Sequence, residues 1–204
     1  MQVNEQPETA DAHQEYASLT LAIDDFVAEV TRHHRAHIRC RRGCFLCCVP
    51  PRSLFRIEGE RIRDAVLRLP GDVRARIRAR VENPTRMLCP LLEEGVCLVY
   101  RDRPILCRTQ GMPLAVERDD KAYDVDYCRL NFQGVPRDFE FGRRHILNLD
   151  GTNFILASLN LKLVEAAGLD PEEDGRVCFK KAATGRLVGV PTPVSQEEAS
   201  EVSG

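Results

Sequence analysis

The rest of the chain has to fold around one segment, Cys40-Arg-Arg-Gly43-Cys44-Phe-Leu-Cys47-Cys48-Val-Pro-Pro51. Its cysteines, its glycine and its Pro-Pro pair exclude an ordinary helix or strand and predict a loop that carries metal ligands. The two-residue gap between Cys44 and Cys47 allows two thiolates to face one metal ion across a tight turn, a spacing found in structural zinc sites and in iron–sulfur sites. Gly43 permits the positive φ that such turns often need.

Four further cysteines follow, Cys89, Cys97, Cys107 and Cys128, and Cys178 stands fifty residues beyond the last of them. Clustered cysteines in a reducing cytosol are better explained as metal ligands than as disulfides, and we expect Cys178 to be unrelated to the cluster. Four thiolates suffice for one zinc ion or one 4Fe–4S cluster. The eight cysteines from Cys40 to Cys128 therefore leave three alternatives: one site with spare thiols, two sites, or one site with redox-active or disulfide-forming cysteines.

Arginine side chains accompany the second group of cysteines. Zinc with four thiolates, or an oxidised 4Fe–4S cluster with four thiolates, carries a net charge of about −2 and needs donors around it when it is partly buried. Arg103 and Arg108 flank Cys107. We expect both arginines to stabilise this negative charge, and Tyr100 to pack or hydrogen-bond beside them.

The cysteine motifs resemble those of a known family. The matching residues are Cys40-Arg-Arg-Gly-Cys44-Phe-Leu-Cys47-Cys48, Cys89-Pro90-Leu-Leu, Gly95-Val-Cys97-Leu-Val-Tyr100, Arg103-Pro104-Ile-Leu-Cys107-Arg108 and Cys128. Their order is similar to that of the CxxCxxCC, or YkgJ-like, cysteine-cluster proteins, described as a zinc- or iron-chelating domain, and covers roughly residues 40 to 130. The three-residue gap after Cys40, where the family's name implies two, makes Cys40 a weaker candidate ligand than the others.

The resemblance implies chelation of an iron–sulfur cluster, zinc or iron, with a redox, structural or metal-handling role. Related sequence occurs in flagellin lysine N-methylases, so a protein-modifying enzyme is one alternative, although the chain is short for S-adenosylmethionine and a protein substrate together. A zinc-shaped protein-interaction module is another. The spacing from Cys40 to Cys47 also matches the cluster motif of radical S-adenosylmethionine enzymes, but the chain lacks the repeated strand–helix pattern of their barrel.

The periodicity of apolar residues predicts a mainly α fold with small β elements, a single domain over residues 14–190 whose irregular loops are organised by metal. We expect disordered tails at 1–13 and 191–204. Predicted elements are helices at Gln14–His37, Ile57–Leu69, Asp72–Val81 and Asn153–Ala167, a short strand at Val96–Tyr100 and a hairpin of Met112–Glu117 with Ala122–Tyr127. Thr152 is the expected N-cap of the last helix, which is apolar nearly all round and should be buried.

Two further features concern partners and histidines. A formal net charge of −2 gives no electrostatic argument for nucleic acid or an anionic membrane, and the polar start of the chain lacks a signal peptide, so we expect a cytoplasmic protein. His33, His34 and His37 precede the first cysteine group, and either His33 or His37, which share a helix face, could supply a nitrogen ligand, but we expect these histidines to form a solvated helix end. His145 has no visible partner in the sequence.

Overall fold

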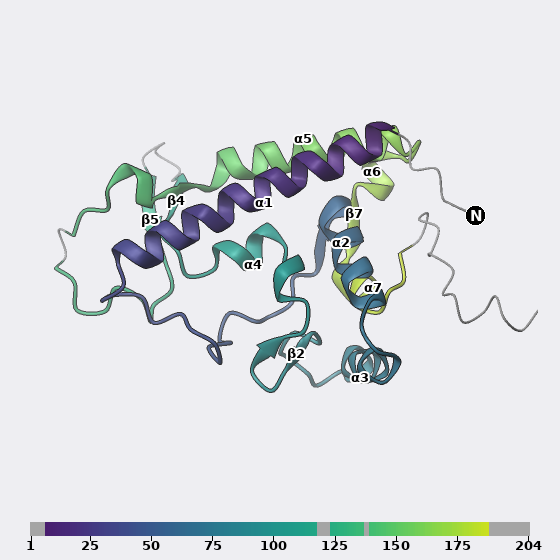
Figure 1. The fold of residues 1–204 in the computed structure, drawn as a ribbon, viewed down its shortest axis with the longest axis horizontal. Coiled ribbons are helices and arrows are strands. Elements are labelled where there is room, and N and C mark those ends of the chain that lie inside the picture. Colours follow the sequence, from purple (N-terminus) through teal and green to yellow (C-terminus); the bar gives the residue numbers. More distant parts are fainter. Residues whose placement is uncertain (1–6, 118–122, 137–138, 188–204) are drawn as a thin grey trace, which may run out of the picture.

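The computed structural model describes residues 7–117, 123–136 and 139–187, and within them it is mainly helical with small β elements, as predicted (Figure 1). The helices are α1 (Pro7–His33), α2 (Arg56–Leu67), α3 (Gly71–Glu82), α4 (Ile105–Thr109), α5 (Leu149–Ala166), α6 (Pro171–Asp174) and α7 (Phe179–Ala183), with the 3-10 turns η1 (Tyr100–Asp102) and η2 (Arg143–His145). The strands are β1 (Ser53–Phe55), β2 (Leu92–Glu93), β3 (Val96–Cys97), β4 (Leu114–Glu117), β5 (Tyr123–Asp126), β6 (Leu147–Asn148) and β7 (Arg176–Cys178).

The two long helices α1 and α5 lie side by side along one edge of the molecule, and α4 lies beneath α1 (Figure 1). One hydrophobic core fills the space between them, with Tyr16 and Ile23 of α1, Leu163 of α5, Ile57 of α2 and Ile105 of α4 all buried. Burial of this apolar stripe, and not helix propensity alone, stabilises so long a helix as α1.

A second core joins α2, α3 and α7 to the short β1–β7 ladder. Its buried residues include Ile62 and Val66 of α2, Ile77 of α3 and Phe179 of α7, and the side chain of Cys97 packs against its margin. The cysteine-bearing loops therefore lie beside a packed core, which supports their conformation.

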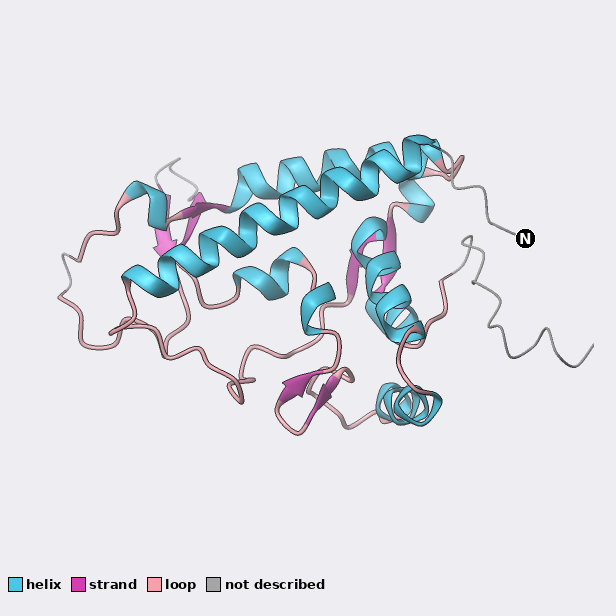
Figure 2. Ribbon diagram, viewed as in Figure 1, coloured by secondary structure: helices cyan, strands magenta, loops and turns pink. Residues whose placement is uncertain are grey.

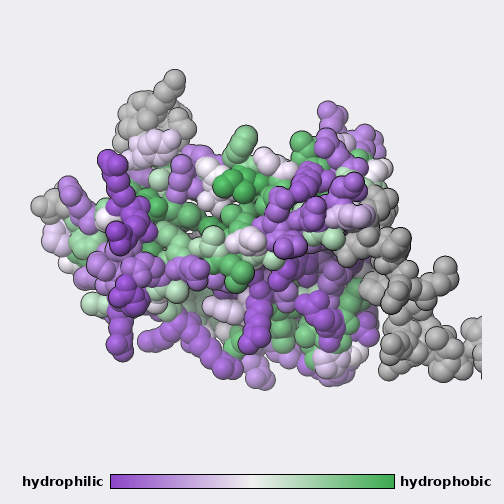
Figure 3. Space-filling model, turned by 45° about the horizontal axis from the view of Figure 1, so that its top comes forward, coloured by the Kyte–Doolittle hydropathy of each residue, from purple (hydrophilic) through white to green (hydrophobic). Residues whose placement is uncertain are grey.

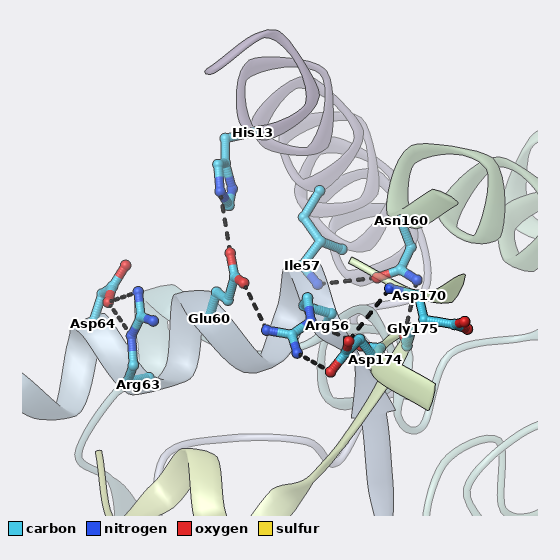
Figure 4. Close-up of polar contacts among 10 residues, drawn as sticks. All are labelled: His13, Arg56, Ile57, Glu60, Arg63, Asp64, Asn160, Asp170, Asp174 and Gly175. Carbon is cyan, nitrogen blue, oxygen red and sulfur yellow. Dashed lines mark hydrogen bonds and ion pairs between the residues drawn. The ribbon is translucent and has the colours of Figure 1, made fainter. Parts of the chain in front are cut away.

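A buried polar anchor fixes the beginning of α2 to the segment after α5 (Figure 4). Arg56, which is 2% exposed, pairs with Glu60 at 3.4 Å and with Asp174 at 3.0 Å. The Asn160 side chain accepts a hydrogen bond from Ile57 N and donates one to Gly175 O. Burying this arginine is tolerated because its charge is paired and its donors are used.

Small antiparallel ladders account for most of the β structure (Figure 2). The predicted hairpin is confirmed as β4 paired with β5, Leu114 opposite Asp126, while its polar turn at 118–121 lies outside the described residues. Strand β6 adds to β4 in parallel, a pairing that the sequence did not indicate. The strand expected at Val96–Tyr100 extends only over Val96–Cys97, because the chain then enters η1.

Two helix boundaries differ from the sequence-based prediction. Helix α1 begins at Pro7 and ends at His33, so residues 7–13 are helical and not a disordered tail. The reason is tertiary packing, because Ala12 is fully buried in the first core. The expected tails at 1–6 and 191–204 lie outside the described residues.

Helix α5 corrects two further expectations. It begins at Leu149, and its N-cap is Asn148, whose side chain accepts a hydrogen bond from Gly151 N at 2.9 Å, whereas Thr152 lies inside the first turn. The helix is also not buried all round, since Phe154 is 75% exposed. Figure 3, in a view that brings the α1–α5 edge forward, shows apolar surface between hydrophilic stretches.

Among the residues that the structure describes, no helix combines the length and the apolar character that crossing a membrane requires.

Candidate metal centre

Two consecutive turns shape the first cysteine loop. Cys44 N donates to Arg41 O and Cys48 N donates to Phe45 O, each at 2.9 Å. Gly43 has a φ of +88°, the left-handed conformation expected for this turn. These turns replace regular secondary structure in the loop.

Main-chain hydrogen bonds bring the second group of cysteines to this loop. Cys89 N donates to Cys48 O at 2.8 Å, which joins the two groups directly. The β2–β3 ladder, with Leu92 opposite Cys97, returns the chain toward Cys89. Helix α4 then begins after Pro104, whose carbonyl accepts a hydrogen bond from Cys107 N. Separate stretches of chain thus meet at one place beneath α4.

Four partly buried thiols lie close enough to affect one another's ionisation. We call Cys48, Cys89, Cys97 and Cys107 the inner thiol set. The pKa of the Cys107 thiol is raised to about 12, first by burial and then by the neighbouring thiols of Cys89, Cys97 and Cys48, while Arg103 acts to lower it. Burial likewise raises the pKa of Cys89 to about 11, again with Cys97 and Cys48 as neighbours. The inner set is therefore one electrostatically connected group.

Hydrogen-bond donors face the inner thiol set. Burial raises the pKa of Cys89, and a hydrogen bond from the backbone N–H of Leu91 lowers it. The backbone N–H of Val99 lowers the pKa of Cys97 in the same way. Both donors lie two residues after the cysteine, and both favour the ionised sulfur. They stabilise negative charge at the place where a cation would need anionic ligands.

Of the two predicted arginines, Arg103 is the one near the thiols. Its charge acts against burial to lower the pKa of Cys48 and Cys97, as it does for Cys107. Its guanidinium lies 3.5 Å from the centroid of the Tyr100 ring and donates to Tyr100 O at 2.9 Å. Tyr100 therefore holds Arg103 in position, while its own ring is 59% exposed.

Arg108 differs from the sequence-based expectation. Its buried guanidinium donates to Asp24 on α1 and to the carbonyl oxygens of Arg103 and Arg101. Its donors thus connect α4 to α1 and η1. They are not directed at the thiols, which differs from the role that the sequence predicted for Arg108. In a helix, consecutive side chains differ in direction by about 100°, so Cys107 and Arg108 point to different neighbours.

The remaining cysteines of the motif form a second group nearer the surface. We call Cys40, Cys44, Cys47 and Cys128 the outer thiol set. Burial raises the pKa of the Cys40 thiol, and the thiols of Cys44, Cys128 and Cys47 raise it further. The pKa of Cys47 is also raised, first by burial and then by Cys48, with Cys44 and Cys128 contributing. Cys40 and Cys47 are nevertheless exposed residues.

Asn131 and Gly111 organise the outer set. The Asn131 side chain is 1% exposed, lies 3.4 Å from Cys40 Sγ through its Nδ2 atom, and donates to Gly111 O at 2.7 Å. Gly111 has a φ of +89°, and a Cβ atom there would come within 2.9 Å of Cys40 Sγ and 3.4 Å of Cys128 Cβ. Only glycine leaves room for these two cysteines to approach each other.

Cys47 and Cys48 form the junction between the sets. Burial raises the pKa of the Cys48 thiol and the Cys47 side chain lowers it, so these consecutive residues connect the two sets. Cys178, by contrast, is exposed on β7 opposite Ser53.

The sequence also missed a group of histidines. His34 and His145 are 8% and 5% exposed, so the expected solvated helix end is wrong for His34, and His145 does have partners. His34 Nε2 lies 3.2 Å from His145 Nδ1, and the ligand atoms of His33, His34 and His145 all lie within 4.8 Å of one another. Burial lowers the pKa of His34, and the neighbouring histidines lower it further. The aromatic residues shortly before His145, Phe139 and Phe141, were a signal in the sequence that this segment packs into the protein.

No family model, no curated protein and no solved structure matches this chain. The function must therefore be argued from the residues and the geometry of this chain.

Proposed function

We propose that this chain is a metal-binding protein of the CxxCxxCC (YkgJ-like) type, which coordinates iron–sulfur clusters, or zinc or iron ions, through its clustered cysteines. The observation that carries the proposal is the convergence of thiols from distant stretches of chain into an inner and an outer set of four, which are connected through Cys44, Cys47 and Cys48. Four thiolates are the ligand number of one zinc ion or one cluster. Of the three alternatives that the sequence left open, this arrangement favours two sites.

The donors around the inner thiol set support thiolate ligation. A neutral thiol is a weak acceptor, so the N–H groups of Leu91 and Val99 and the charge of Arg103 have their full effect only on ionised sulfur. Four thiolates in a partly buried site would repel one another strongly unless a cation lay between them. Bound metal would satisfy both requirements and would stabilise loops that contain little regular structure.

Zinc and a 4Fe–4S cluster differ in how far apart their thiolate ligands lie. A tetrahedral zinc ion with Zn–S bonds of about 2.3 Å requires sulfurs about 3.8 Å apart. Over the described ranges, the group of potential ligands whose atoms all lie within 4.8 Å of one another consists of histidines and contains no cysteine. A 4Fe–4S cluster separates its thiolates more widely, because each binds a different iron. Both thiol sets consist of cysteines alone, and on this ground we favour a 4Fe–4S cluster over zinc.

A redox role fits this arrangement best. The outer thiol set includes the exposed Cys40 and Cys47, whereas the inner set is partly buried. Because Cys47 and Cys48 are consecutive residues that belong to different sets, centres bound by the two sets would adjoin each other. An exposed centre next to a shielded one would let electrons enter from a partner at the surface and be held where solvent has little access.

Purification without oxygen tests the proposal, followed by iron, zinc and acid-labile sulfide analysis and a visible spectrum. We expect brown protein with about eight iron and eight sulfide per chain, the content of two 4Fe–4S clusters. Colourless protein with two zinc ions would support thiolate ligation but overturn the preference for clusters. Protein with neither metal, and with all cysteines reactive toward a thiol reagent, would overturn the proposed function.

A further inference from the structure

The histidine triad of His33, His34 and His145 lies where the end of α1 meets η2. His33 is the last residue of α1 and His34 follows it, while His145 ends η2, more than a hundred residues later in the chain. His34 and His145 are buried, and His33 is exposed. Two ligands are therefore fixed inside the protein, and the third is on the side from which a cation could enter.

The second ring nitrogen of His145 is buried beside the carboxylate of Glu29. Among the described residues, His145 Nε2 has no partner within hydrogen-bond distance, and Glu29 Oε1 lies 3.7 Å from it. Orientation of the Nε2–H of His145 toward this carboxylate would satisfy the buried nitrogen and leave Nδ1 to ligate a cation. Glu29 itself is held in place by Arg32, which donates to both carboxylate oxygens.

The distances suit a metal ion bound through imidazole nitrogens. His34 Nε2 and His145 Nδ1 are 3.2 Å apart, and a tetrahedral zinc ion with Zn–N bonds of about 2.05 Å requires about 3.3 Å between ligand nitrogens. With Nδ1 as the ligand atom, His145 would direct its Nε2–H toward Glu29. A carboxylate that accepts the second N–H of a ligating histidine is the usual arrangement around metal sites.

Aromatic rings surround the buried side of the triad. The rings of Phe132, Phe139 and Phe141 have centroids 5.4, 6.0 and 5.8 Å from that of His34. These rings fix the orientation of His34 and limit the access of water from that side. The exposed His33 ring is not packed against these phenylalanines, so a change of its rotamer could bring it to the cation as the third ligand.

We propose that His33, His34 and His145 form a binding site for a divalent transition-metal cation of the zinc type, distinct from the two thiol sets. Three imidazoles are ligands that zinc and its neighbours prefer over magnesium or calcium. Three protein ligands leave a fourth position for water, the arrangement of zinc sites that are open to a further ligand. Glu29 is a positioning residue that orients His145. The site contains no cysteine, so its test is independent of the proposed cluster binding.

Zinc titration of the anaerobically purified protein tests this site, with the imidazole ¹⁵N resonances as readout. We expect one equivalent of Zn²⁺ to shift the resonances of His33, His34 and His145 and to leave those of His13 and His37 in place. This readout requires no variant and does not respond to zinc at cysteines. Unmoved resonances of the triad would overturn the proposal.

A pair of histidine variants adds an affinity measurement. His33→Ala removes an exposed ligand and should lower the zinc affinity of the triad at least about 10-fold, whereas His37→Ala, outside the triad, should not change it. Glu29→Gln should weaken binding by about 10–100-fold, while Asp25→Asn, which removes an equal charge one turn earlier on α1, should have little effect. Equal zinc affinities for His33→Ala and His37→Ala would contradict the site.

Discussion

The inner and outer thiol sets contain the same kind of ligand in different surroundings. The inner set packs against a hydrophobic core and faces backbone N–H groups and Arg103. The outer set includes the exposed Cys40 and Cys47, and a single buried amide, Asn131, lies beside Cys40. The difference indicates that neighbours, and not ligand type, determine how strongly each centre is tied to the fold and how readily solvent reaches it.

The largest expected effect is the loss of an inner ligand. Cys97→Ser removes a ligand beside the second core, so we expect the metal-loaded protein to lose about 5 kcal/mol of stability, or roughly 10–20 °C in Tm. Cys47→Ser removes an outer ligand that is exposed, so we expect a loss below about 2 kcal/mol. Thermal unfolding of the two variants measures the contrast. Equal losses would remove the distinction between the sets.

A buried carboxyl at the beginning of α4 makes the stability of the fold depend on pH. Glu58 Oε1 accepts a hydrogen bond from Ile105 N at 2.8 Å, and burial raises the pKa of Glu58 to about 7. The folded state thus holds this proton more tightly than the unfolded state. Its contribution to stability is complete below about pH 4.5 and is lost as the pH rises to about 7, a change of about 3 kcal/mol.

Glu58→Gln isolates this effect, because glutamine keeps an acceptor for Ile105 N but has no proton to lose. Relative to the wild type, the variant should gain about 2.5 kcal/mol between pH 5 and pH 8. Urea unfolding at the two pH values provides the comparison, and metal–thiolate effects cancel because both proteins share them. A pH-independent difference would show that Glu58 is ionised throughout.

A smaller effect is expected from the charge of Arg103. Its removal in Arg103→Gln should make reduction of the inner centre less favourable by about 1 kcal/mol, since a nearby positive charge stabilises the added electron. Arg42→Gln removes an equal charge from an exposed position in the first loop and serves as the matched control. Redox titration of the visible spectrum compares them. Equal potentials would mean that Arg103 does not act on the inner set.

The smallest change is expected at the remaining cysteine. Cys178→Ser replaces an exposed side chain away from both thiol sets, so stability should change by less than about 0.5 kcal/mol and the metal content should stay the same. Metal analysis and thermal unfolding check this. A loss of metal in Cys178→Ser would add this residue to the ligands and change the division into two sets.

Much of the fold could be predicted because local patterns determine it. Apolar periodicity located α2, α3 and α5, and the alternation around a polar turn located the β4–β5 pair. The start of α1 could not be predicted in this way, since Ala12 becomes part of a core only when other elements pack on it. The exposed face of α5 was missed because periodicity shows which residues are apolar and not which of them find a partner.

The candidate ligands followed from cysteine spacing, but their grouping did not. Cys47 and Cys48 are neighbours in sequence and fall into different sets, since Cys48 is joined to the second group by the Cys89 N to Cys48 O hydrogen bond. The histidine triad was also beyond prediction, because His34 and His145 are separated by 111 positions. Contacts over such distances depend on the complete fold.

The most direct test of the division into two sets is alkylation of the metal-loaded protein during slow treatment with a chelator, with mass spectrometry reporting each cysteine separately. We expect Cys178 to react at once, then Cys40, Cys44, Cys47 and Cys128 together, and finally Cys48, Cys89, Cys97 and Cys107 together. If Cys47 and Cys48 became reactive at the same rate while Cys128 followed a different course, the two-set account would be contradicted.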